Sequence, residues 1–156
     1  MGSVEINEAS LANCLVLVVS GNRFTCQLVR SLLRGIGIQN VEASHDLDEA
    51  REQLRYFRFN LLILDAGPAA GFDGMRFLEL IQFFPAKLQT TPVVLLTAQL
   101  TRHQIERIQT LQVKHVITKP FSPAALYNHV YGALGLIPEL GDNRASDRSS
   151  EQLWKI

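Results

Sequence analysis

The segment Leu61–Ala66, LLILDA, is the clearest indication of the fold in this 156-residue chain. Four apolar residues follow one another without alternation and lead into Asp65, a pattern typical of a strand that is buried on both faces. Four other short runs with β-like composition stand before and after it. We therefore predict five strands, at Leu15–Val19, Val41–Ser44, Leu61–Leu64, Val93–Leu96 and His115–Thr118.

Amphipathic segments alternate with these strands. Asp46 begins an Asp-x-x-Glu capping box, Thr101 is placed to cap a later helix, and Ser122 precedes a proline suited to the first helical position. Gly35 and Gly135 are placed to end helices. The apolar stripes of the five expected helices are Phe24, Leu28 and Leu32; Leu47, Ala50 and Leu54; Met75, Leu78 and Ile81; Ile105, Ile108 and Leu111; and Leu126, Val130 and Leu134.

Strict alternation of strands and helices with short connections predicts right-handed crossovers and a parallel sheet. The expected fold class is therefore α/β: a single flavodoxin-like domain with a five-stranded sheet of order 2-1-3-4-5 and five helices on both faces. In such sheets ligands bind beyond the carboxyl ends of the strands. That edge is where we look for function.

The amino-acid composition limits the classes of function that this chain can have. Fifteen basic residues balance fifteen acidic ones, so no net charge favours nucleic acid or an anionic membrane. The longest apolar run, Cys14–Val19, is much shorter than the ~20 residues of a membrane span. The segment before it lacks the basic region of a signal peptide, and we therefore expect a cytoplasmic location.

The chain divides into three parts by composition. Residues 1–13 form an N-terminal extension, residues 14–135 the domain, and residues 136–156 a polar tail that we expect to be mobile. Cys14 and Cys26 stand in apolar contexts and are expected to be reduced, packed thiols. The four histidines lie on different elements, and we expect each to act in isolation.

Three functional groups follow successive strands. Asp65 is a carboxylate of the type that accepts a phosphoryl group, Lys119 can neutralise a phosphate oxygen, and Thr97 can donate a hydrogen bond to another. Ala98 is small and leaves the approach to Asp65 open. Each residue alone also fits an ordinary structural role, but their joint position at one edge favours a phosphate-handling site.

The strand-end segments VVSGN, LLILDA, VVLLTA and TKPFSP resemble, in order and spacing, those of response regulator receiver domains. The resemblance covers about residues 14–135. It implies that Asp65 is the phospho-acceptor, Thr97 the switch hydroxyl, and Lys119 the lysine that precedes a cis proline. It also implies a non-enzymatic signalling module of two-component phosphorelays.

Three places depart from that family. Receivers usually carry two adjacent acidic residues after the first strand, which hold Mg²⁺, but this chain has Ser20 and Gly21 there. Mg²⁺ depends on carboxylate oxygens, so we expect no bound cofactor and weak or absent Mg²⁺ binding. The usual aromatic switch residue is replaced by Val116, and the loop 66–74 is one residue longer before Asp73.

These features favour an atypical receiver that acts through protein–protein contacts, with phosphorylation of Asp65 weak or absent. Its expected partners are a histidine kinase, a phosphotransfer protein or a downstream effector. One alternative is a functional receiver phosphorylated on Asp65; the other is a flavodoxin-like ligand-binding protein or enzyme, although no G-x-G-x-x-G or P-loop is present. Tyr127 and Tyr131 are interface candidates, and the last two helices with the fifth strand are a possible homodimer face.

Overall fold

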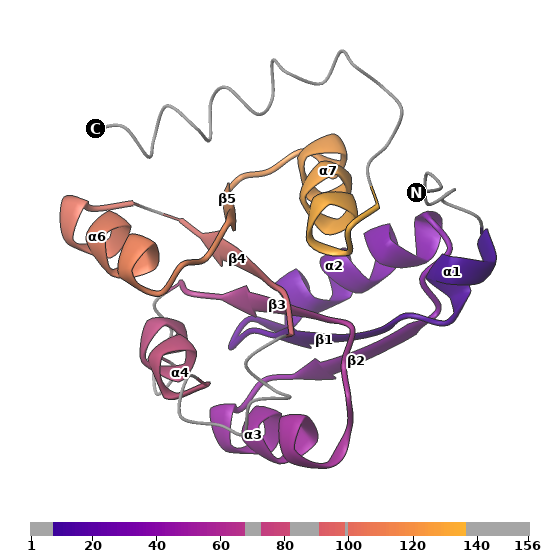
Figure 1. The fold of residues 1–156 in the computed structure, drawn as a ribbon, viewed down its shortest axis with the longest axis horizontal. Helices are drawn as coiled ribbons and strands as arrows, with labels where there is room; N and C mark the ends of the chain where they lie inside the picture. The colour runs from indigo at the N-terminus through magenta and orange to yellow at the C-terminus, as the bar shows by residue number, and fades with distance from the viewer. Residues whose placement is uncertain (1–7, 68–72, 82–90, 99, 137–156) are drawn as a thin grey trace.

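The computed structural model describes residues 8–67, 73–81, 91–98 and 100–136 (Figure 1). Its strands are β1 (Leu15–Val19), β2 (Asn40–Ser44), β3 (Leu61–Asp65), β4 (Val93–Thr97) and β5 (His115–Thr118). Its helices in these ranges are α1 (Glu8–Ala12), α2 (Arg23–Gly35), α3 (Leu47–Tyr56), α4 (Gly74–Ile81), α6 (Arg102–Thr110) and α7 (Pro123–Ala133).

The five strands form one parallel sheet in the order β2-β1-β3-β4-β5. This confirms the predicted fold class and strand order, with small differences in strand ends. β2 begins one residue earlier than predicted, and β3 and β4 each extend by one residue, to Asp65 and Thr97. A short helix that the sequence did not indicate, α1, lies inside the expected N-terminal extension.

Helices cover both faces of the sheet (Figure 1). On one face α2 and α7 pack over Val16, Val18 and Ile63, and on the other α3, α4 and α6 pack over Leu17 and Leu64. The side chains of β3 are all buried, as expected for a strand covered on both sides. The sheet is therefore packed between two hydrophobic layers, one on each face, and both layers fix the position of its carboxyl edge.

Side-chain caps begin the helices as predicted at three positions. The Asp46 carboxylate accepts from the backbone of Asp48 and Glu49, which is one half of the capping box predicted there. Thr101 forms a capping box with Gln104, and Ser122 accepts from Ala125. Asn22, which the sequence analysis did not single out as a cap, accepts hydrogen bonds at the start of α2. Gly135 follows α7 with φ of 73°, a left-handed conformation that favours glycine.

The predicted core stripe of α2 is wrong. Phe24 is 71% exposed and Leu28 39% exposed, and the buried face is instead formed by Cys26, Val29 and Leu33. Both sets of residues have helical spacing, so periodicity alone cannot choose between them. The choice is made by the packing of α2 against β1, β2 and the neighbouring layer of α7.

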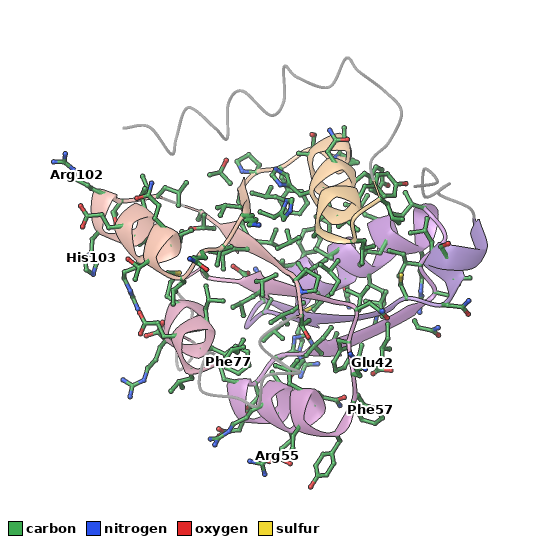
Figure 2. The ribbon with its side chains drawn as sticks, viewed as in Figure 1. Glu42, Arg55, Phe57, Phe77, Arg102 and His103 are labelled. Atoms are coloured by element: carbon green, nitrogen blue, oxygen red, sulfur yellow. The ribbon has the colours of Figure 1, made fainter. Side chains whose placement is uncertain are left out.

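Other large apolar side chains are exposed at the end of α3. Tyr56 is 73% and Phe57 54% exposed, and Figure 2 shows Phe57 and Arg55 at the outer side of the molecule.

Within the described residues, no helix has the length and apolar character needed to cross a membrane.

Candidate functional site

Asp65 ends β3 at the carboxyl edge of the sheet and is 4% exposed. Its Oδ2 accepts two hydrogen bonds of 2.7 Å, one from the hydroxyl of Ser20 and one from the ammonium of Lys119. Its Oδ1 accepts a 2.8 Å bond from the backbone N–H of Gly67. Both carboxylate oxygens are therefore engaged by groups of the protein itself.

Ser20 follows β1 and is fully buried. Its backbone N–H donates to Ser44 in the continuation of the β1–β2 ladder, which places the hydroxyl beside the end of β3. The same hydroxyl oxygen accepts a 3.0 Å bond from the backbone of Asn22. Ser20 thus donates to Asp65 and accepts from the start of α2, so its hydroxyl is held in one orientation.

Lys119 follows β5 and forms an ion pair with Asp65 at 2.7 Å. Its side chain is 25% exposed, and its backbone N–H donates to Thr97 at 2.8 Å. The bond between Lys119 and Pro120 is cis, in agreement with the family resemblance. The ammonium therefore reaches Asp65 from a strand end that is tied to the end of β4.

Thr97 and Ala98 stand at the end of β4, next to the end of β3. Asp65 pairs with Leu96 in the register of the two strands, and Thr97 is the next residue along β4. Thr97 is buried at 3% exposure, whereas Ala98 is exposed. The structure thus brings all the predicted phosphate-contacting residues to the same edge of the sheet.

Two glycines that the sequence analysis did not single out shape this site. A Cβ on Gly67 would lie 2.9 Å from Asp65 Oδ1, and a Cβ on Gly74 would lie 2.3 Å from the backbone oxygen of Asp65. Gly74 begins α4, so only a residue without a side chain lets the helix start so close to β3. The sequence signal that could have identified them is their position, two and nine residues after Asp65 at the end of a predicted strand.

The described residues around Asp65 do not fit a magnesium ion. Among the described residues, no group of three or more His, Cys, Asp or Glu side chains is placed to hold a metal. Gly21 is exposed and contributes no side chain, and Ser20 offers a neutral hydroxyl that already donates to Asp65. Asp73, the acidic residue just before α4, is exposed and its carboxylate accepts a hydrogen bond from the backbone N–H of Arg76.

Cys26 and His45 both contact the backbone oxygen of Ser20. The backbone oxygen of Ser20 is 3.8 Å from Cys26 Sγ and 3.1 Å from His45 Nδ1, and Sγ and Nδ1 are 3.5 Å apart. Burial raises the pKa of the Cys26 thiol, and the negative charge of Asp65 raises it further. Both cysteines are free thiols, as predicted, and Cys26 is buried.

The interface candidates Tyr127 and Tyr131 are half-buried on α7. Tyr131 packs against the hydrophobic layer shared with α2, and burial raises the pKa of its hydroxyl. The Tyr127 hydroxyl lies 3.6 Å from the position that a Cβ on Gly35, the last residue of α2, would take. Both rings therefore contribute to the contact between α7 and α2.

Comparison with known proteins adds to this geometry. The family model of the response regulator receiver domain matches residues 16–131. The signal transduction histidine-protein kinase BarA of Escherichia coli is 30% identical over 122 residues, which cover 78% of this chain but only 13% of the kinase. The chemotaxis protein CheY-3 of Vibrio cholerae is 28% identical over 116 residues, 73% of this chain and 86% of CheY-3.

Solved structures support the fold. The chemotaxis response regulator CheY4 of Vibrio cholerae matches with a TM-score of 0.68 at 22% identity, covering 77% of this chain and 98% of CheY4. A response regulator from Chloroflexus aurantiacus matches with a TM-score of 0.69 at 24% identity, covering 78% of this chain and 98% of that chain. Both matches span nearly the whole of those proteins.

Proposed function

Because the chain belongs to the family of response regulator receiver domains, we propose that it is an atypical receiver that signals through protein contacts with little or no phosphorylation of Asp65. The supporting observation is the engagement of Asp65 by Ser20 and Lys119. A non-enzymatic role and a cytoplasmic location are part of this proposal.

Phosphorylation requires an oxygen of Asp65 to attack phosphorus and the surrounding charges to balance the incoming group. Lys119 supplies one positive charge, which the carboxylate already neutralises. Phosphoryl transfer relies mainly on positioning and on charge neutralisation. Ser20 contributes only the dipole of its hydroxyl, where a carboxylate would hold a metal ion that neutralises charge. Hydrogen bonds to a charged group contribute about 1.5–3 kcal/mol each, so the carboxylate is stabilised in its unmodified state.

The test is incubation of the purified chain with acetyl phosphate and Mg²⁺, followed by intact mass measurement. The expected result is no phosphorylated species above the level seen with Asp65→Asn. A phosphorylated fraction that appears within minutes and is lost in Asp65→Asn would overturn the proposal. It would establish instead that the chain is a functional receiver phosphorylated on Asp65.

We propose the exposed stripe of α2, formed by Phe24 and Leu28 with the half-buried Leu32, as the contact surface for a partner protein. It begins next to Asn22, whose backbone is bonded to Ser20. α2 carries two exposed arginines, Arg23 and Arg34, and no acidic residue, whereas the guanidinium of Arg30 donates to the backbone oxygen of Val41 in β2. The partner that fits is a helix with an apolar face flanked by acidic side chains, presented by a signalling protein.

The contact surface is tested with a candidate histidine kinase or phosphotransfer protein in a direct binding measurement. Phe24→Ser with Leu28→Ser should weaken binding at least about tenfold, and added salt should weaken the wild-type complex because the arginines are screened. The matched control is Tyr56→Ser with Phe57→Ser, which removes two exposed apolar side chains at the end of α3. Equal loss in both variants, or no loss in the first, would exclude this surface.

The sequence predicted a different interaction surface, a homodimer face formed by α6, β5 and α7 with Tyr127 and Tyr131. Since both rings already lie in the α7–α2 contact, their substitution changes packing as well as any interface. This dimer face stays a prediction, and it is tested separately below.

A further inference from the structure

His115 and His129 were expected to act in isolation, but the structure brings them together. His115 begins β5, and His129 lies on α7, which packs against that strand (Figure 1). Their Nδ1 atoms are 3.3 Å apart, and the two rings are nearly perpendicular, with centroids 5.5 Å apart and an interplanar angle of 84°. Two imidazole nitrogens thus face each other across the strand–helix contact.

The separation of the two nitrogens suits a shared metal ion. Zinc binds histidine nitrogens at roughly 2.0–2.1 Å, and two such ligands at a tetrahedral angle lie roughly 3.3–3.4 Å apart. In the metal-free chain this contact is a hydrogen bond between the two rings, and the tautomers decide which nitrogen donates and which accepts. The observed 3.3 Å is also close to the distance that one zinc ion would span, with the ion in place of the shared hydrogen.

The surrounding backbone holds the pair in place. A Cβ on Gly132 would lie 2.9 Å from Cε1 of His115, so the glycine lets α7 lie directly against this imidazole. His129 stands three residues before Gly132 and therefore projects from the same side of the helix. Both histidines are half-buried on regular elements, which limits their motion without closing the site to solvent.

We propose that His115 and His129 form a two-ligand site for a transition-metal dication of the zinc type. Imidazole nitrogens suit zinc, copper and nickel, whereas Mg²⁺ prefers oxygen. No third His, Cys, Asp or Glu ligand joins them within the part of the chain that the structure describes, so water completes the coordination. The site lies at the start of β5, and Lys119 follows the other end of that strand, so it is independent of the Asp65 site.

The test is calorimetric titration of the untagged chain with ZnCl₂ at pH 7.5, where imidazoles are mainly neutral. We expect saturable binding of one zinc per chain, weakened at least about tenfold by His115→Ala, by His129→Ala and by Gly132→Ala, which displaces the His115 ring. His103→Ala is the matched control, because that exposed histidine lies on the outer side of α6 (Figure 2). Cys26→Ala controls for binding at the Cys26–His45 pair.

Both controls should leave the affinity within about twofold of the wild type. A second readout on the unmodified chain, the ¹⁵N resonances of the imidazoles, removes any dependence on how the variants fold. The Nδ1 resonances of His115 and His129 should shift on zinc addition while that of His103 does not. Wild-type affinity in His129→Ala, loss of binding in Cys26→Ala, or unmoved His115 and His129 resonances would each overturn the proposal.

Discussion

At the scale of single residues, Ser20 is the side chain that most directly tests the atypical character of the site. Ser20→Asp with Gly21→Asp would place two carboxylates beside Asp65 and supply the oxygen ligands that Mg²⁺ needs. Gly21 is exposed and is not among the described glycines with positive φ, so an aspartate fits its backbone. We expect the double variant to gain Mg²⁺-dependent phosphorylation by acetyl phosphate, measured by intact mass.

Asp65→Asn in the same background is the control and should abolish that gain. Because Ser20 is fully buried, the added carboxylate repels Asp65 when no metal is present, and we expect a lower melting temperature that Mg²⁺ restores. A folded double variant that binds Mg²⁺ but accepts no phosphate would contradict the view that the acidic pair is the main missing part.

Cys26 provides a residue-scale prediction for alkaline pH. Its thiol has a raised pKa in the folded chain, from burial first and then from the charge of Asp65. The folded state therefore keeps the proton longer than the unfolded state, whose thiol titrates near pH 8.5. The resulting stability is present below that pH and is lost as the pH rises toward the folded pKa. Urea unfolding at pH 7.5 and 9.5 should show a smaller loss for Cys26→Ala than for the wild type, and an equal loss would contradict this origin.

At the scale of elements, α2 carries two apolar stripes with different roles. Leu33 is fully buried against the sheet, whereas Leu28 is 39% exposed on the opposite side. Leu33→Ala should lower the free energy of unfolding by about 2–5 kcal/mol, because it leaves a cavity in the core. Leu28→Ala, the same change on the same helix, should cost less than about 1 kcal/mol. Urea denaturation of both variants measures the difference, and similar losses would mean that the outer stripe is buried in solution.

At the scale of the whole molecule, the contact between α7 and α2 sets the role of the tyrosine pair. Tyr127→Ala with Tyr131→Ala should lower stability, because Tyr131 packs on the shared hydrophobic layer and Tyr127 lies near Gly35. If the two rings also form a dimer face, self-association measured by analytical ultracentrifugation should fall in the folded double variant. Unchanged association together with reduced stability would leave them only the intramolecular role.

The sheet order and the edge that carries Asp65, Thr97 and Lys119 were predictable from local sequence patterns. Apolar runs without alternation mark buried strands, and the rules for β-α-β connections leave few ways to arrange five of them. Asp65, Thr97 and Lys119 therefore had to meet at the carboxyl edge, as they do. The caps at Asp46, Thr101 and Ser122 were predictable for a similar reason, because a cap depends on residues three positions away.

Contacts between residues far apart in the chain were not predictable in this way, because they depend on tertiary packing. Ser20 and Asp65 are 45 residues apart, and the donation of the hydroxyl to the carboxylate depends on the exact pairing of β1 with β3. The contact between His115 and His129 depends on how α7 packs against β5. The exposure of Phe24 depends on which side of α2 packs against the sheet. Periodicity describes each element separately, whereas these contacts are set by the packing between elements, which no local pattern encodes.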